Sequence, residues 1–437
     1  MNRGRNPLIL IGEKMPTTEQ KEKILNSKKN KRIKKEVKRF HTGDWVLDCI
    51  LSDSEESKEK GFPLGKVVHL WGASKSGKSF LCLNAIYAML ATYGKKNVDY
   101  LWIDVERAFD INSEELYGFS VNDNEHISYA NTVEKWQAVI ETWVEGKDPN
   151  RPKIIVLDSL DTLSVSEELA RKDDRIKHYK KDGGTGEQKT YGMEKAKKIS
   201  ETLRTSMGTL ADNNTTMFVI SQERTNVNAT MFQKSTTVSG GKGPGFYSTV
   251  QLELKPTELY GDKYRPTGGC VQAHAVKSRT PFEARRALIS LDYKIGFDVI
   301  GSAIDDLYSL RDEYGKLDEK KCQALKWVET FDLNNLGGDA VSDKEIKQFA
   351  EDNGFVESVR EEFSRLTAKN IQMYISKTPE FRNKFVEQFG VMSRDDLIQW
   401  IEEEEEREIE LEKRVKSKFY HIENNLRPQR KSRKLID

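Results

Sequence analysis

The sequence lacks the features that mark membrane proteins, secreted disulfide-bonded proteins and zinc sites. No run approaches the roughly 18 apolar residues that a helix needs to cross a bilayer, and the basic residues 1–5 lead into only four apolar residues, 8–11, too few for a secretory signal. The four cysteines have no CxxC spacing: Cys49, Cys82, Cys270 and Cys322. We therefore expect a soluble, cytoplasmic protein whose reduced thiols pack in its interior.

The sequence also lacks a net charge of one sign. Lys and Arg number 71 against 70 Asp and Glu, which gives a formal net charge of +1. This balance hides a segregation along the chain, with basic runs at residues 21–39, 171–198 and 427–434 and an acidic run at residues 402–406. Basic runs of this kind favour contacts with polyanions, and the alternative is that they are solvated faces of surface helices.

Short β-rich runs alternate with helical stretches through the centre of the chain. With no internal repeat, this βαβ order predicts an α/β fold with a mainly parallel sheet and ligand chemistry at the carboxyl ends of its strands. The runs are residues 66–71, 99–104, 154–157 and 216–221. Further strands, for which we expect antiparallel pairing, are predicted at residues 250–254, 271–276 and 287–292.

The chain of 437 residues divides into three predicted parts. Residues 1–40 form an N-terminal arm, in which residues 8–11 are a short strand and a basic helix runs from a capping box at Thr17 and Gln20 to about Arg39. Residues 41–301 form the core. Residues 302–437 form a smaller helical domain with a charged tail, including a long helix at about residues 394–418.

A phosphate-binding loop follows the first predicted strand of the core. Residues 67–79 read VVHLWGASKSGKS, an apolar run followed by GxxxxGK[ST]. The glycines let backbone N–H groups converge on phosphate oxygens, and the next helix directs its positive end at the same anion. We expect Lys78 to reach the β- and γ-phosphates and Ser79 to bind Mg²⁺. The predicted nucleotide-binding residues here are Gly72, Ala73, Ser74, Lys75, Ser76, Gly77, Lys78, Ser79 and Phe80.

Three polar residues follow the neighbouring predicted strands. Glu106 is the candidate base that activates a water for attack on the γ-phosphate. Asp158 ends an apolar run and is expected to support Mg²⁺, with Ser159 as a donor beside it. The Gln222 amide is suited to hydrogen-bond the γ-phosphate and to relax when that group leaves. For Glu106 and Gln222, the alternative is an exposed polar residue.

The order of these segments resembles the RecA recombinases. It includes residues 72–79, 103–110, 154–159, 221–222, 238–244 and 276–280, and the stretches SKSGKS, GGKGPGFYS and KSRT are similar to the UvsX recombinases of tailed phages. The resemblance covers roughly residues 40–300, with a weaker echo at residues 378–382. It implies a RecA-like P-loop ATPase core that uses ATP and Mg²⁺, and a polymerisation role for the N-terminal arm.

The resemblance also assigns roles to single residues. Asp110 occupies the position that contacts adenine, but Ser113 stands where family members have a stacking aromatic, and Tyr117 is a candidate substitute. Lys277 and Arg279 match a pair of basic residues that reach the nucleotide of the next subunit, and the alternative is a pair of surface cations at a strand end. The implied catalytic residues are therefore Lys78, Glu106, Gln222, Lys277 and Arg279.

Two loops are implied to bind DNA, one between residues 163 and 200 and one after Gln222. They carry Lys and Arg for phosphates and apolar side chains that can wedge between bases. The alternatives are plain surface loops and, for Phe232, a place in the core. The candidate DNA-binding residues are Arg171, Arg175, Lys177, Lys180, Lys181, Arg224, Met231, Phe232, Lys234 and Lys242.

These expectations combine into one function. The sequence predicts a DNA-dependent ATPase that forms head-to-tail filaments on single-stranded DNA and catalyses homologous pairing and strand exchange with double-stranded DNA. A recombination mediator and a single-strand-binding protein are expected partners, a membrane is not, and a phage-encoded protein would act in the host cytoplasm. A hexameric helicase or translocase and an ATP-dependent mediator are the alternatives on this fold. The acidic run is a candidate competitor of DNA for the basic loops.

Overall fold

The computed structural model describes most of the chain after residue 36. The described residues are 37–52, 60–170, 192–225, 236–238, 240–262, 264–278, 284–308, 327–329 and 341–426. No helix within these ranges is long and apolar enough to cross a membrane. The predicted strand at residues 8–11 and the basic tail lie outside them. The predicted basic helix does not reach Arg39, because Arg39–Phe40 is strand β1 and pairs with β2, Phe62–Pro63.

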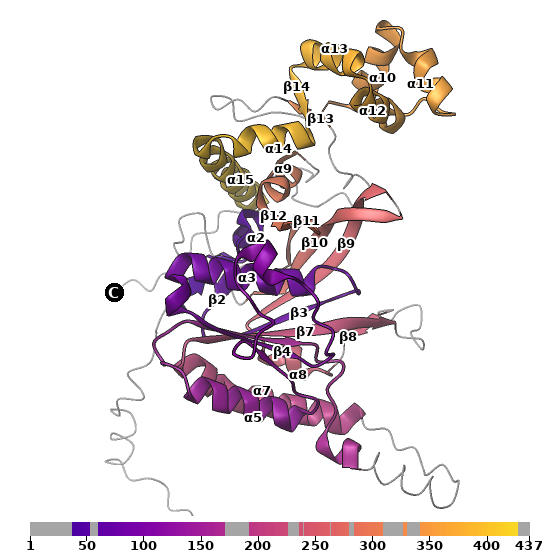
Figure 1. Ribbon diagram of the computed structural model, residues 1–437. Coiled ribbons are helices and arrows are strands. Elements are labelled where there is room, and N and C mark those ends of the chain that lie inside the picture. The colour runs from indigo at the N-terminus through magenta and orange to yellow at the C-terminus, as the bar shows by residue number, and fades with distance from the viewer. Residues whose placement is uncertain are drawn as a thin grey trace, which may run out of the picture. The chain divides into compact units, whose positions relative to one another are not determined.

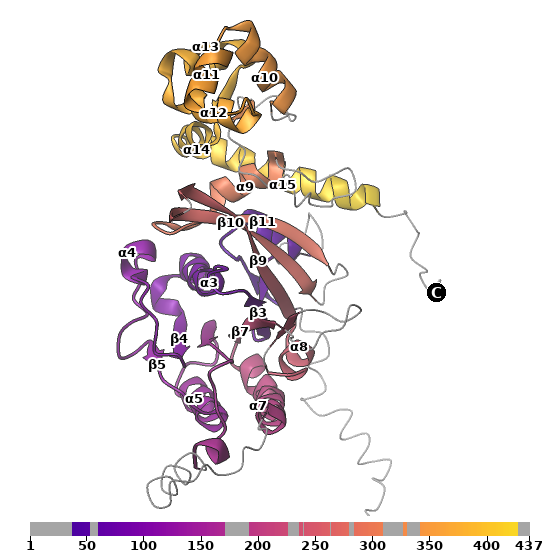
Figure 2. The same ribbon diagram turned by 90° about the vertical axis from the view of Figure 1, so that its right-hand side faces the viewer.

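A ten-stranded sheet forms the centre of the protein (Figures 1 and 2). Its order is β12-β11-β10-β9-β3-β7-β6-β4-β5, with β8 paired to β7. The strands are β3 Val67–Gly72, β4 Asp99–Asp104, β5 Ile127–Ser128, β6 Lys153–Asp158, β7 Thr215–Thr225, β8 Thr236–Val238, β9 Val250–Asp262, β10 Arg265–Lys277, β11 Arg285–Asp292 and β12 Gly296–Asp298. The prediction of an α/β fold with a mainly parallel sheet is confirmed.

The pairing divides this sheet into two halves. Strands β5, β4, β6, β7, β3 and β9 pair in parallel, whereas β9, β10, β11 and β12 pair antiparallel. The expected antiparallel group is therefore present, with one correction: β9 also pairs in parallel with β3. Parallel strands end at one edge, so the tips of β4, β6 and the phosphate-loop strand β3 come together there.

Helices cover both faces of the sheet, and alternate side chains of the central strands feed two hydrophobic clusters. Ile154 and Val156 belong to one cluster with α3, Lys78–Tyr93, whereas Ile155 and Leu157 belong to the other with α5, Val133–Glu145, and α7, Gly192–Asp212. Figure 2 shows α3 and the α5–α7 pair on opposite sides of the strands. Burial on both faces explains why these strands are continuous apolar runs.

Three C-terminal helices complete the first of these clusters. Helices α9, α14 and α15 supply it with buried residues that include Ile304, Leu397, Ile401, Leu411 and Val415. Their bounds are α9 Val299–Tyr308, α14 Arg394–Glu402 and α15 Glu405–Leu426, and α15 packs against α9 and α2, Trp45–Ile50. Part of the predicted C-terminal domain thus closes the core, and the division of the chain at residue 301 stays a prediction.

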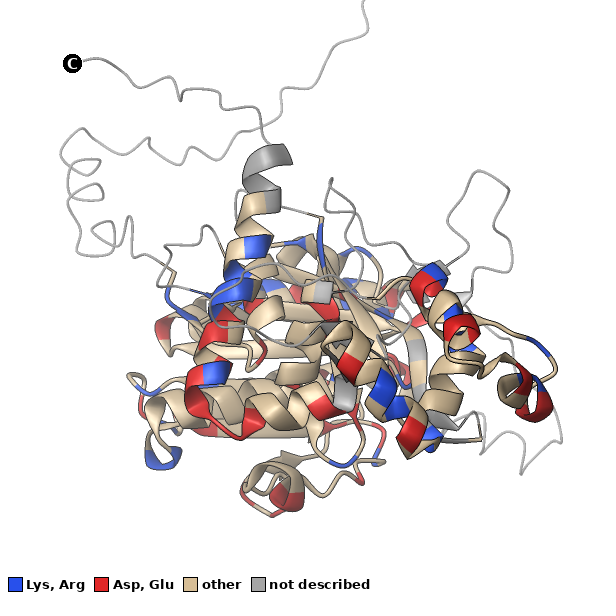
Figure 3. Ribbon diagram, turned by 90° about the horizontal axis from the view of Figure 1, so that it is seen from above, with Lys and Arg blue, Asp and Glu red and all other residues tan. Residues whose placement is uncertain are grey.

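The single long helix predicted from residue 394 is wrong, because α14 and α15 are separate helices. Arg407 stabilises the break between them: its guanidinium donates to the Trp400 carbonyl at 2.6 Å, satisfying an acceptor that a helix end leaves free. It also pairs with Glu403 and Glu404 at 3.7 and 3.0 Å. In the view of Figure 3, acidic and basic residues are interspersed along the helices. The acidic run therefore spans the junction between the two helices, with its side chains exposed.

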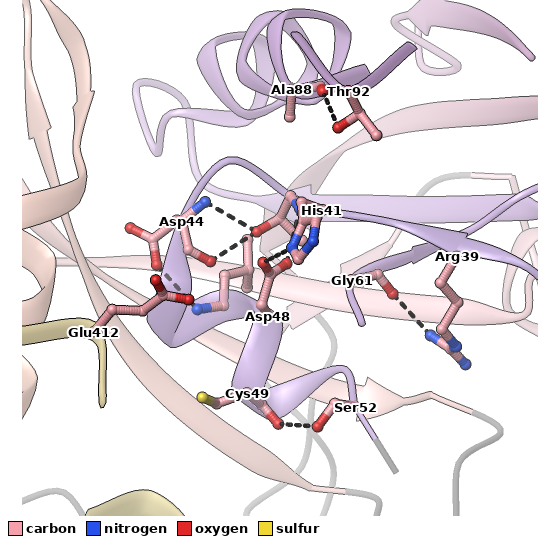
Figure 4. Close-up of polar contacts among 12 residues, drawn as sticks. Arg39, His41, Asp44, Asp48, Cys49, Ser52, Gly61, Ala88, Thr92 and Glu412 are labelled. Carbon is pink, nitrogen blue, oxygen red and sulfur yellow. Dashed lines mark hydrogen bonds and ion pairs between the residues drawn. The ribbon is translucent and has the colours of Figure 1, made fainter. Parts of the chain in front are cut away.

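Hydrogen bonds fix the segment where the chain enters the core, before and along α2 (Figure 4). Asp44 caps α2 by accepting from the Leu47 N–H at 2.9 Å, and burial raises the pKa of this carboxyl to about 7. Asp48 accepts from the Thr42 N–H and contacts His41 Nδ1, both at 2.8 Å. This segment thereby holds the helix on which α15 packs.

A second set of helices has its own hydrophobic cluster, around Phe349, Phe381 and Phe385. Ser342 and Glu345 form a capping box at its first helix, and Pro379 begins its last. The helices are α10 Asp343–Asp352, α11 Val356–Glu362, α12 Ala368–Lys377 and α13 Pro379–Phe389. The short strand β13, Trp327–Glu329, precedes them in sequence and pairs with β14, Val391–Ser393, which follows them. The stretch at residues 378–382 thus supplies the buried Phe381 of this cluster.

Candidate nucleotide-binding site

The phosphate loop joins β3 to α3 with the backbone geometry that its glycines allow. A Cβ atom on Gly72 would lie 2.1 Å from the Leu254 carbonyl oxygen, so no larger residue fits there. Gly77 has φ +81° and begins α3 in the left-handed region. The buried Lys78 Nζ donates to the carbonyls of Gly72 and Ala73 at 3.1 and 2.6 Å. The loop therefore closes around its own lysine, whose ammonium group is held by two of the loop's carbonyls.

Burial has opposite effects on the two charged groups beneath this loop. It lowers the pKa of Lys78, although the carboxylates of Asp158, Asp161 and Glu106 oppose that effect. It raises the pKa of Asp158 to about 6, and the nearby Glu106 and Asp104 act in the same direction. In both cases burial disfavours the charged form of the group, and a nearby opposite charge would stabilise that form. Lys78 therefore favours the binding of a phosphate, and Asp158 favours the binding of a cation.

The residues that would hold Mg²⁺ lie together at the ends of β6 and the phosphate loop. Ser79 Oγ donates to Asp158 Oδ2 at 2.8 Å. A hydroxyl and a carboxylate are the hard oxygen ligands that Mg²⁺ prefers beside nucleotide phosphates, so this pair fits the cation. When bound, Mg²⁺ would neutralise charge that develops on the phosphates.

Glu106, the candidate base, lies beyond the end of β4 and receives two side-chain hydrogen bonds. Ser159 Oγ donates to Glu106 Oε1 at 2.6 Å, and Gln222 Nε2 donates to the same oxygen at 3.3 Å. The predicted strand end at residue 221 is wrong, because β7 continues through Gln222 to Thr225, where its last residues pair with β8. The predicted residues nevertheless converge, since β4, β6, β7 and β3 are neighbours in the sheet.

A cavity of about 210 Å³ joins these residues to the loop after β4. Asp104 shapes that loop by accepting from the N–H groups of Ala108 and Phe109, at 3.4 and 3.1 Å. Five of the lining residues were not predicted from the sequence, although an acid at the end of a predicted strand marked Asp104; they are Asp104, Ala108, Phe109, Ile111 and Ile220. The lining residues are Ser74, Lys75, Lys78, Ser79, Asp104, Glu106, Ala108, Phe109, Asp110, Ile111, Asp158, Ser159, Ile220 and Gln222.

Ser113 and Tyr117, the two positions considered for stacking on the adenine, are not among the residues that line this cavity. Ser113 is 3% exposed, and its hydroxyl accepts from the Val121 N–H at 3.0 Å. The Tyr117 ring packs against Tyr87 and Phe119 at centroid distances of 5.8 and 5.9 Å, and burial raises the pKa of its hydroxyl. The interpretation of Tyr117 as a stacking substitute therefore stays a prediction. Phe109, Asp110 and Ile111 face the cavity instead.

Lys277 lies at the end of β10, away from this cavity. Its Nζ donates to the carbonyls of Gly245 and Phe246, at 2.9 and 3.1 Å, in the short helix α8, Gly243–Tyr247. Lys242 is exposed just before that helix. The structure describes the backbone of Arg224 in β7. The remaining candidates lie outside the described residues: Arg171, Arg175, Lys177, Lys180, Lys181, Met231, Phe232, Lys234 and Arg279.

Known proteins resemble the chain through this same region. A phosphate loop beside strand-borne carboxylates and a glutamine, on a mainly parallel sheet, defines a RecA-like P-loop ATPase. The family model for the RecA N-terminal domain matches residues 14–298, and the chain belongs to the RecA family.

Curated relatives are each called Protein RecA. The protein of Leptospira meyeri is 29% identical over 300 residues, which cover 67% of this chain and 70% of the relative. That of Mycoplasma genitalium is 30% identical over 277 residues, or 63% and 71% of the two chains. That of Mycoplasma mycoides subsp. mycoides is 26% identical over 305 residues, or 67% and 79%.

Proposed function

We propose that this chain is a DNA-dependent ATPase that forms filaments on single-stranded DNA and catalyses homologous pairing and strand exchange in recombination and repair. The observation that carries the proposal is the contact of Gln222 with Glu106 beside the phosphate loop, in a chain of the RecA family. An amide that touches the candidate base is positioned to report whether the γ-phosphate is present. A nucleotide-driven change in DNA grip requires such a reporter.

The chain's own residues account for the hydrolysis step. Lys78 binds the phosphates, and Ser79 with Asp158 holds Mg²⁺. Glu106 takes the proton of the attacking water, while Ser159 and Gln222, which donate to it, keep its carboxylate in one orientation. Ser159 accordingly acts on the position of the base rather than on the phosphate.

A neighbouring subunit completes the site in this proposal. Lys277 and Arg279 reach the nucleotide of the next protomer and neutralise charge that develops on its γ-phosphate. Within its own chain Lys277 holds the end of α8, which follows the second predicted DNA loop. A head-to-tail contact of this kind produces an open helix or a ring, so hydrolysis depends on assembly.

Finer assignments belong to the same proposal. The stretches SKSGKS, GGKGPGFYS and KSRT support a phage-encoded member similar to UvsX, acting in the host cytoplasm with a mediator and a single-strand-binding protein. The segments at residues 163–200 and 223–243, which include the first turns of α7 and the paired ends of β7 and β8, supply the DNA contacts with the ten candidate residues named above. The N-terminal arm at residues 1–40 serves polymerisation.

Two measurements test the proposal together. Phosphate release with and without single-stranded DNA should show stimulation by DNA. Negative-stain microscopy with an ATP analogue and single-stranded DNA should show open helical filaments, whereas closed rings would favour the helicase or translocase. Hydrolysis that does not respond to DNA, together with an absence of filaments, would contradict the proposal.

A further inference from the structure

Asp161 makes a contact that the catalytic scheme does not use. It lies three residues after Asp158, and its Oδ2 accepts from the backbone N–H of Gln222 at 2.7 Å. Its own carbonyl accepts from Lys195 Nζ, also at 2.7 Å. Asp161 and Lys195 are both half-buried. One residue thus touches both the strand that carries Gln222 and the first turn of α7, Gly192–Asp212.

The position of this contact in the chain links it to both predicted DNA loops. Asp161 precedes residues 171–191 and Lys195 follows them, so their contact ties together the two chain segments that flank the first loop. Gln222 precedes residues 226–235, the centre of the second loop. Gln222 also lies 3.3 Å from Glu106 through its side chain. Three described residues therefore join the nucleotide site to the bases of both loops.

We propose that Asp161 is a positioning residue that couples the nucleotide site to DNA binding, by fixing the Gln222 backbone and tying it to α7 through Lys195. The inference rests on the proposed function, because it concerns how Gln222 transmits the nucleotide state.

The chemistry of the contact supports transmission. A carboxylate that accepts from a backbone N–H forms a charge-assisted hydrogen bond, which is stronger than the bond to a neutral acceptor. The neighbouring Leu160 N–H donates to the Ile220 carbonyl at 2.8 Å, so the segment after β6 follows β7 on both sides of Ser221. A shift of the Gln222 backbone must therefore move Asp161 or break the hydrogen bond between the Gln222 N–H and the Asp161 carboxylate. Because Lys195 holds the Asp161 main chain, such a movement reaches α7.

The experiment measures coupling rather than activity. For the full-length protein, the affinity for a fluorescent single-stranded oligonucleotide is measured with a slowly hydrolysed ATP analogue and again with ADP. The ratio of the two affinities is the coupling between the sites. We expect Asp161→Ala to lower this ratio at least about fivefold, the lower end of typical allosteric couplings. An unchanged ratio in a folded Asp161→Ala protein would overturn the inference.

The conservative variant separates the hydrogen bond from the charge. Asp161 lies close enough to Lys78 to raise its pKa, so loss of the carboxylate alone could alter nucleotide binding. Asp161→Asn removes the charge but keeps an oxygen that can accept from the Gln222 N–H. We expect Asn to retain most of the coupling that Ala loses. Equal losses in the two variants would assign the effect to charge and reject the positioning role.

The other end of the contact provides an independent test with a matched control. Lys195→Met removes the donor to the Asp161 carbonyl, and we expect it also to lower the coupling ratio. Arg204→Met removes one positive charge from an exposed position on the same helix, and we expect no change in the ratio. Equal ratios in these two variants would reject the path through Lys195. A wild-type protein without coupling would instead contradict the proposed function itself.

Discussion

The two sides of the nucleotide cavity are built from different parts of the chain. On the phosphate side, Lys78 and Ser79 follow a loop that Gly72 and Gly77 make possible, and Asp158 lies beside Ser79 at the end of β6. On the other side, Phe109, Asp110 and Ile111 present side chains from an irregular loop. The first side needs particular residues at fixed spacing, whereas many combinations of side chains can contact a base. A sequence motif therefore predicts the phosphate side of the cavity. No motif predicts the opposite side, where we expect the nucleobase and which we call the nucleobase side.

The largest effect on turnover alone is expected from Glu106→Gln on the phosphate side. Loss of the base should lower the turnover number by roughly 10² to 10⁴, while nucleotide affinity stays nearly constant because the phosphate contacts remain. Steady-state phosphate release and binding of a fluorescent nucleotide analogue measure the two quantities. Glu114→Gln, an exposed change on helix α4, Ser113–Tyr117, is the control and should retain turnover. Undiminished turnover in Glu106→Gln would place the base elsewhere.

Lys78→Ala provides the complementary change on the same side. It removes the buried cation that the loop encloses, so we expect nucleotide binding to be lost along with turnover. The same fluorescent analogue measures binding. Intact turnover in this variant would contradict the assignment of the nucleotide site.

A third prediction asks whether the phosphate side extends to a neighbouring subunit. The double variant Lys277→Ala, Arg279→Ala should be inactive alone, and the intervening Ser278, buried and uncharged, cannot replace either cation. Mixed with the Glu106→Gln protein, it should regain part of its hydrolysis, because a mixed interface combines an intact base with intact cations. Phosphate release across a series of mixing ratios measures the recovery. Co-assembly without recovery would reject the shared site.

A substitution on the nucleobase side should give a smaller effect. Asp110→Ala removes one acceptor from the cavity, and a single hydrogen bond contributes about 0.5 to 1.5 kcal/mol, so we expect the KM for ATP to rise by no more than about tenfold. The turnover number should stay nearly constant, and the preference for ATP over GTP should narrow. Tyr117→Phe is the matched control, because its ring packs outside the cavity. An effect of Tyr117→Phe on nucleotide preference would show that the Tyr117 hydroxyl contributes to recognition of the nucleobase.

The same contrast explains what the sequence could predict. The central strands were predictable because each is an apolar run flanked by polar residues. For β4, Asp99–Asp104, both predicted bounds agree with the structure. Glu106, Asp158 and Gln222 were identifiable because parallel neighbours end at one edge of a sheet. The break between α14 and α15 was not, since it depends on contacts of Arg407 with Trp400, Glu403 and Glu404. Such contacts arise from packing, which a helical pattern does not encode.

The C-terminal helices show this limit most clearly. Leu411 and Val415 of α15 belong to the same hydrophobic cluster as the sheet, although they follow the last strand of that sheet by more than 100 residues, since β12 ends at Asp298. The hydrophobic periodicity of this segment predicted a helix, but it did not predict that the helix packs against α9 and α2. A truncation after Gln399 to test the acidic run would therefore remove a helix that packs on the core, whereas substitution of Glu403 and Glu404 by Gln keeps that helix.

The smallest predicted effect is a pH dependence on the phosphate side. The pKa of Asp158 is raised to about 6, so the carboxylate is ionised above that pH and protonated below it. Mg²⁺ must then displace a proton, and the affinity for the Mg²⁺–nucleotide complex should fall as the pH drops through 6. Protonation at this pKa predicts about a fourfold loss between pH 7.5 and 5.5. Because Asp158 lies on the phosphate side, the pH profile reports on that side of the cavity.

Asp158→Asn is the control for this profile, because its amide has no proton to exchange in this range while the nucleotide keeps its own titration. Titrations of a fluorescent nucleotide analogue with Mg²⁺ at a series of pH values should therefore give a steeper profile for the wild-type protein than for Asp158→Asn. His69, whose pKa burial lowers to about 3, stays neutral throughout and does not contribute. Parallel profiles for the two proteins would mean that Asp158 is already ionised at pH 5.5, and that Ser79 and Lys78 outweigh its burial.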